Sequence, residues 1–407
     1  AGGKKDKVKT RKEESTMDVD IPVAHARYVD TVIPEPVQER PEMARGRSAR
    51  VALPKDQSYK LNESDIRALQ QQGFTRGLAE TLTRNNIAFP LRVWVVDNSG
   101  SMTIRDGHRI IESSQKDKVK LVDCTRWSEI QQTVEYHVQM AALLQAPTVF
   151  RLLNDPGRVS GPQQFSVGEK GENMIDHDVA TALQTIRNSS PGGVTPLSEH
   201  LREIRSNVLA IESSLRDEGS KVAIILATDG LPTDFRGSCD AHTKREFTET
   251  LRSLEGLPVW IVVRLCTDDD EVVNFYNTLD ENLELSLEVI DDFVQEAEEV
   301  NSHNSWLNYA LPLHRCREMG YHNKLFDLLD ERQLSPDELR DFLLLLFGAG
   351  KFDGVPDPQA DWDGFVKMIK PIVEKENLQW NPISKRMCPW VDIKKLNKTY
   401  KTGCSIM

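Results

Sequence analysis

The 407-residue chain is predicted to contain an α/β domain with a mostly parallel, six-stranded sheet and helices on both faces. Two observations predict this class. Short apolar runs alternate with segments of helical periodicity between residues 89 and 300, and the run "KVAIILATDG" (221–230) is almost wholly apolar. A strand is apolar throughout when helices cover both faces of its sheet. Neighbouring parallel strands are joined by a crossover connection, which is usually a helix.

The segments before the sheet have a different composition. Residues 1–57 combine a lysine-rich start with scattered prolines and few apolar residues, so we expect a disordered basic and proline-rich tail. Residues 58–88 contain two short helical patterns, capped by Ser64 and Thr75 respectively. We expect these patterns to form a helical brace that packs against the following domain.

Six strands are expected within the α/β domain of residues 89–300. They are residues 91–96, 148–154, 163–169, 221–230, 258–265 and 282–290. Helical periodicity is found in residues 125–145, 178–188, 196–219, 244–256 and 267–279. In the last strand apolar residues alternate with polar ones, which is typical of an edge strand covered on one face.

The remaining segments are helical or polar. Residues 301–390 are expected to form a helical C-terminal region, in which Ser335 and Glu338 make a capping box. Residues 391–407 are expected to be a basic tail that ends in "CSIM". The polar insertion 103–123 directly follows "DNSGSM" (97–102), the turn that ends the first strand, so we expect it to lie beside any site at the end of that strand.

Oxygen-bearing side chains follow the predicted strands where they end. Asp97, Ser99 and Ser101 leave the first strand, Asp229 leaves the strand in "ILATDGLPTD", and Thr195 precedes a helix in "SSPGGVTPL". The carboxyl ends of parallel strands meet at one edge of a sheet, where ligands bind. Five oxygen groups at one crevice suit Mg²⁺, which prefers octahedral oxygen coordination and retains several waters. Mn²⁺ and Ca²⁺ are the alternative ions.

Together, "DNSGSM", "GGVTPL" and "ATDG" resemble the von Willebrand factor type A domain and its metal-ion-dependent adhesion site, with intracellular members the more similar. The resemblance covers residues 89–300 and implies a Rossmann-like fold. It implies that Ser99 and Ser101 bind the metal directly, and Thr195 directly or through water. It also implies that Asp97 and Asp229 act mostly through water, and that a Glu or Asp of a partner protein completes the coordination.

No catalytic constellation is found in the sequence. The position two residues after Asp97 is a serine, whereas an aspartate phosphotransferase needs a second Asp there, and no Gly-x-Ser-x-Gly elbow occurs. We therefore expect a metal-dependent protein-binding module, acting in adhesion or as a scaffold, and not an enzyme. The alternatives are an accessory subunit of an ATPase or chelatase-like complex, and a structural protein whose site meets no ligand.

Charge and cysteine usage bear on partners and location. A net charge of −12 argues against nucleic acid, and six scattered cysteines without metal-binding spacing suggest the cytoplasm. Cys404 stands fourth from the end in a C-a-a-X pattern that favours farnesylation. Upstream lie the basic residues Lys394, Lys395, Lys398 and Lys401. Membrane association at the cytoplasmic face is thus a second expectation.

Overall fold

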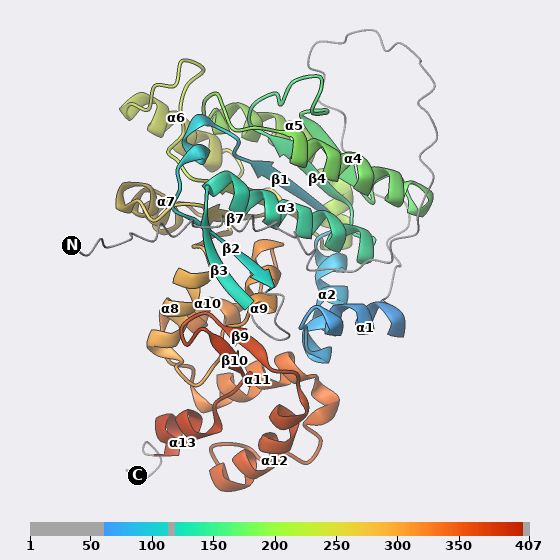
Figure 1. Ribbon diagram of the computed structural model, residues 1–407, viewed down its shortest axis with the longest axis vertical. Coiled ribbons are helices and arrows are strands. Elements are labelled where there is room, and N and C mark those ends of the chain that lie inside the picture. Colours follow the sequence, from blue (N-terminus) through green and yellow to red (C-terminus); the bar gives the residue numbers. More distant parts are fainter. Residues whose placement is uncertain (1–60, 113–118, 402–407) are drawn as a thin grey trace, which may run out of the picture.

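The computed structural model describes residues 61–112 and 119–401, which form a sheet lobe and a helical lobe (Figure 1). The predictions for the tail of residues 1–57 and for Cys404 lie outside the described ranges. Within those ranges, none of the helices combines the length and the apolar character needed to cross a bilayer.

The central sheet has six strands in the order β5-β4-β1-β6-β7-β8. Their bounds are β1 (Leu91–Val96), β4 (Thr148–Leu152), β5 (Gln164–Val167), β6 (Val222–Thr228), β7 (Val259–Leu265) and β8 (Leu287–Ile290). All neighbours pair in parallel except β5, which runs antiparallel to β4. The predicted α/β class and mostly parallel sheet are confirmed. The last strand lies at an edge as expected, but it begins at Leu287.

Helices cover both faces of the sheet, as predicted. One face packs against α5 (Leu197–Glu218), α6 (Ala241–Arg252) and α7 (Asp270–Asn282), and the other against α3 (Arg126–Leu143) and α4 (Ile175–Asn188). Strand β1 shows why: Val93 and Val95 point into the first core, whereas Trp94 and Val96 point into the second. Side chains alternate across a strand, so a strand buried on both faces must be apolar throughout.

The helical lobe combines segments from both ends of the described chain. Its helices are α1 (Glu63–Gln71), α2 (Arg76–Ala88), α8 (Phe293–His303), α9 (Leu311–Glu318), α10 (Lys324–Glu331), α11 (Pro336–Phe347), α12 (Trp362–Lys375) and α13 (Ile393–Lys401). They share one apolar core, which the end of α3 also joins. The predicted brace thus packs largely on the C-terminal helices: a Cβ at Gly77 would collide with the backbone of α11 and Gly348.

Two details of the helix ends differ from expectation. The cap of α1 is Asn62 rather than Ser64, because the Asn62 side chain accepts the backbone N–H groups of Ser64 and Asp65. In the segment expected as a basic tail, residues 393–401 form α13, whose Leu396 and Tyr400 are buried in the lobe. The cap at Thr75 is confirmed.

Two hairpins and three 3-10 turns complete the described elements. They are the hairpins β2 (Gly107–Glu112) with β3 (Val119–Cys124) and β9 (Gln379–Asn381) with β10 (Arg386–Cys388), and the turns η1 (Gly100–Thr103), η2 (Glu172–Met174) and η3 (Ala349–Lys351). The first hairpin is formed by the polar insertion. It starts near the end of β1 and extends along α3 toward the helical lobe (Figure 1).

Buried ion pairs connect the two lobes. Arg317 of α9 binds Glu288 of β8 at 2.8 Å, Asp330 of α10 at 2.9 Å, and Glu296 of α8. The neighbouring Glu318 accepts from His137 of α3 at 3.1 Å. Charged groups this deeply buried are tolerated when they are paired, so α9 is fixed against the sheet lobe by charge as well as by apolar contact.

Candidate functional site

The candidate site lies where the sheet reverses its order of connection. Strands β1 and β6 are neighbours, but the chain leaves β1 toward β4 on one side and leaves β6 toward β7 on the other. In open α/β sheets, ligands bind outside the carboxyl ends of the strands at this switch point. Asp97 follows β1 directly and Asp229 follows β6 directly. The strand order therefore places the two carboxylates side by side.

Four of the five predicted residues are linked by hydrogen bonds. The hydroxyl oxygens of Ser99 and Ser101 are 3.0 Å apart, and the Ser101 hydroxyl donates to Oδ1 of Asp229 at 2.9 Å. Oδ1 of Asp97 accepts the backbone N–H of Ser99 at 2.8 Å. The loop after β1 is thus folded around the Asp97 carboxylate, and the Ser101 hydroxyl lies between Ser99 and Asp229.

Asp97 is fully buried, and its second carboxylate oxygen accepts the Thr228 hydroxyl at 2.6 Å. Burial and the negative charge of Asp229 raise the pKa of Asp97 to about 6, although the hydrogen bonds from Thr228 and Ser99 act in the opposite direction. Two neighbouring carboxylates in a buried place repel each other, so the site favours a cation.

Thr195 lies on the adjacent loop. The N–H of Gly100 donates to the carbonyl of Gly193 at 3.3 Å, and the N–H of Thr195 donates to the Thr233 hydroxyl at 2.9 Å. Gly193 has a φ of +91°, and a Cβ there would collide with the Asn154 side chain. The loop thus approaches the serines closely through a glycine. Thr195 is buried beside the site, and among the described residues no hydrogen bond joins its hydroxyl to the other four.

Arg126, the first residue of α3, was not identified from the sequence. Its Nη1 donates to Oδ2 of Asp229 at 2.9 Å, and its Nε and Nη2 donate to Asp106 at 2.7 and 2.5 Å. The guanidinium is nearly buried. It supplies one positive charge against the carboxylates of Asp97 and Asp229, and it connects the site to the base of the β2–β3 hairpin.

The oxygen spacing is compatible with neighbouring ligands of a divalent ion such as Mg²⁺, as well as with the hydrogen bonds observed. Adjacent ligands of an octahedral ion with bonds of ~2.1 Å are separated by about 3 Å. The distances Ser99 Oγ to Ser101 Oγ and Ser101 Oγ to Asp229 Oδ1 are 3.0 and 2.9 Å. Ser99, Ser101 and Asp229 could therefore occupy neighbouring positions around one ion, directly or with Asp229 acting through water. The donor set consists of hard oxygens, as Mg²⁺ prefers.

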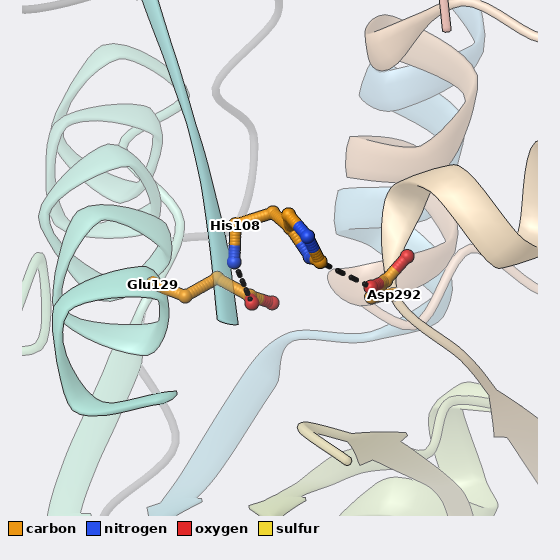
Figure 2. Close-up of side chains that lie close together, drawn as sticks. All are labelled: His108, Glu129 and Asp292. Atoms are coloured by element: carbon orange, nitrogen blue, oxygen red, sulfur yellow. Dashed lines mark hydrogen bonds and ion pairs between the residues drawn. The ribbon is translucent and has the colours of Figure 1, made fainter. Parts of the chain in front are cut away.

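A second cluster, formed by His108, Glu129 and Asp292, does not offer a comparable site (Figure 2). The Glu129 carboxylate accepts the backbone N–H of His108 at 2.9 Å and also pairs with Arg264. The imidazole points away from Glu129 toward Asp292, with Nδ1 3.8 Å from Oδ2. Glu129 is thus held between the hairpin backbone and Arg264, whereas the imidazole of His108 is directed at Asp292, so the side chains do not converge on one point.

The second cluster is better described as an electrostatic contact between the β2–β3 hairpin and the N-terminus of α8. The ion pair with Asp292 raises the pKa of His108. Burial opposes ionisation of Asp292, but the contact with His108 and the backbone N–H groups of α8 outweigh it and lower the pKa of Asp292 to about 2. A carboxylate at this position also complements the helix dipole.

No family model and no curated protein matches the chain. Among solved structures, a mutant of the PilB minor pilin from Streptococcus sanguinis aligns with a TM-score of 0.30 and 16% sequence identity. The alignment covers 49% of this chain and 57% of the pilin chain. A similarity at this level carries no argument about fold or function, so the function is inferred from the residues of the site.

The affinity for Mg²⁺ is expected to fall on acidification. With the pKa of Asp97 at about 6, a proton competes with the metal below that pH. One competing proton gives about tenfold weaker binding at pH 5 than at pH 7.5. Calorimetric titration with Mg²⁺ across this range measures the effect, and an affinity that stays constant down to pH 5 would contradict it.

Proposed function

We propose that the chain is a metal-dependent protein-binding module of the von Willebrand factor type A class. The observation that carries this proposal is the row of oxygens from Ser99 through Ser101 to Asp229, spaced at 3.0 and 2.9 Å at the switch point of the sheet. Together with Asp97 and Thr195, these three residues match the adhesion-site pattern in the sequence. Their hydrogen bonding supports one shared site, with Asp97 as its buried anchor.

The proposed ligand is an acidic side chain of a partner protein. Serine hydroxyls are neutral, so a divalent ion held by them keeps positive charge that a carboxylate can neutralise. Exposed apolar side chains lie on the same loops: Ile104 is 47% exposed just after η1, and Phe235 is 72% exposed in the loop after Asp229. A Glu or Asp flanked by apolar residues would therefore fit the loops at this edge of the sheet.

A quantitative pull-down tests this proposal. Wild-type chain is used as bait in Mg²⁺ and in EDTA, beside Asp97→Ala and the milder Ser101→Ala in Mg²⁺, with exposed Asp217→Ala as a matched control. We expect wild type and Asp217→Ala to retain a partner in Mg²⁺. The recovery of that partner should fall at least about tenfold in EDTA and with Asp97→Ala or Ser101→Ala. Identical partners in all arms would contradict the proposal.

The same experiment distinguishes the alternatives. A single stoichiometric ATPase among the metal-dependent partners would indicate the accessory-subunit function. A structural function of the site would appear as loss of folding in both variants, so thermal unfolding of Ser101→Ala accompanies the pull-down. Ser101 is partly exposed, and its hydroxyl hydrogen-bonds to Ser99 and Asp229 of the site, so loss of this hydroxyl is a mild change.

A further inference from the structure

The charge of the chain is strongly divided between its parts. Residues 362–401 contain nine Lys or Arg and four Asp or Glu, a net charge of +5, whereas the whole chain carries −12. The rest of the chain therefore carries −17. This basic segment forms α12, the β9–β10 hairpin and α13.

The basic residues lie on exposed faces. On α13, Lys394, Lys398 and Lys401 recur at helical spacing and are exposed, while Leu396 and Tyr400 on the opposite side are buried. On α12, Lys367 and Lys370 are likewise exposed. The burial pattern thus fixes these helices in the lobe and directs their lysines outward.

Helices α12 and α13 pack together as one surface. The indole N–H of Trp362 donates to Asn397 at 2.9 Å, and the rings of Trp362 and Tyr400 are 5.4 Å apart. Lys401 also pairs with Asp363 at 2.6 Å. Both helices lie at the lower end of the molecule, whereas the sheet and the candidate metal site lie in its upper half (Figure 1).

An apolar side chain is exposed beside these lysines: Met368 on α12, next to Lys367, is 39% exposed. Basic residues interspersed with exposed apolar ones are the combination that binds the boundary between lipid headgroups and acyl chains.

We propose that the exposed lysine-bearing faces of α12 and α13, which together carry the whole +5 of this segment, dock directly on an anionic lipid bilayer, independently of any lipid on Cys404. A bilayer contacts only one end of the molecule, so most of the acidic remainder stays beyond the ~8–10 Å range of the surface field. The division of charge orients the molecule: α12 and α13, with +5, lie toward the membrane, and the other described residues (61–112, 119–361 and 376–392), with −21, lie away from it. In this orientation the candidate metal site faces the cytoplasm and can reach a partner.

Vesicle co-sedimentation of the full chain carrying Cys404→Ser tests the proposal without lipidation. Vesicles of phosphatidylcholine with 30% phosphatidylserine are expected to bind the protein, whereas pure phosphatidylcholine vesicles are not. Each lysine near an anionic surface strengthens binding roughly fivefold. The triple variant Lys394→Gln, Lys395→Gln, Lys398→Gln should therefore bind at least about tenfold more weakly, and 0.5 M NaCl should weaken wild-type binding similarly.

A matched variant, Lys120→Gln, Lys324→Gln, Arg252→Gln, removes three exposed charges elsewhere and is expected to bind as wild type. An equal loss in this variant, failure to bind the anionic vesicles, or tighter binding to single-stranded RNA than to the vesicles would overturn the proposal. EDTA and Asp97→Ala are expected to leave vesicle binding unchanged, so failure here is distinguishable from failure of the metal-site proposal.

Discussion

Replacement of Arg126 by methionine is expected to raise the affinity for Mg²⁺ by at least about tenfold. The Arg126 guanidinium lies 2.9 Å from the Asp229 oxygen that faces it and is nearly buried. A cation about 5 Å away opposes each unit of charge on an incoming ion by about 3 kcal/mol at an effective dielectric constant of ~20. Arg126 can retain Asp106 while releasing Asp229, which reduces the net effect.

Substitution of Asp106 is expected to change the Mg²⁺ affinity in the opposite direction. It holds the far side of the Arg126 guanidinium through two hydrogen bonds. Asp106→Asn removes the competing carboxylate, so Arg126 pairs more strongly with Asp229. Mg²⁺ should therefore bind this variant more weakly than wild type. The double variant should behave like Arg126→Met, because without the arginine Asp106 has nothing to hold. Non-additivity of this kind indicates that the two residues act through one contact.

Calorimetric titration with Mg²⁺ at pH 8 measures all four proteins under conditions where the Asp97 carboxyl is ionised. Arg216→Met, at an exposed i,i+4 pair in the last turn of α5, is the control and should leave the affinity unchanged. Weaker binding by Arg126→Met would show instead that the arginine mainly holds Asp229 in position.

The sequence predicted the sheet and the grouping of its polar residues because both depend on local patterns. A strand covered on two faces is apolar throughout, and its end is marked where Asp97 or Asp229 follows the last apolar residue. Since parallel strands end at one edge of a sheet, knowledge of the strands was sufficient to bring Asp97, Ser99, Ser101 and Asp229 together.

The remainder depends on contacts between distant residues. Arg126 is 103 positions before Asp229, and in the sequence it looks like an ordinary first residue of a helix. The helical lobe joins segments still further apart: the Thr75 hydroxyl donates to the carbonyl of Leu346, 271 positions later. The β2–β3 hairpin was read only as a polar insertion because its strands are partly exposed and lack an apolar run. The spacing of apolar residues within one segment does not specify which distant segments pair with each other.

Replacement of Arg317 by methionine is expected to lower the free energy of unfolding by about 3–5 kcal/mol. Arg317 is 2% exposed and serves three carboxylates: Glu288 of the sheet edge, Glu296 of α8 and Asp330 of α10. Its removal leaves the buried Glu288 and Glu296 and the partly buried Asp330 without this cation, so the buried carboxylates must then bind a proton or open to water. Urea unfolding at pH 8 measures the loss, and Arg332→Met, which removes a largely exposed pair with Glu338, should cost about 1 kcal/mol or less.

Acidification separates this charge effect from lost packing. Burial raises the pKa of Glu288 to about 7 even with Arg317 present, and it raises the pKa of Glu296 well above its usual range. A raised folded-state pKa means that the folded protein takes up protons on acidification, and a neutral carboxyl no longer needs the arginine. The difference in stability between wild type and Arg317→Met should therefore shrink between pH 8 and pH 5. A difference that stays constant over this range would show that the side chain of Arg317 stabilises the junction of the two lobes by packing rather than by its charge.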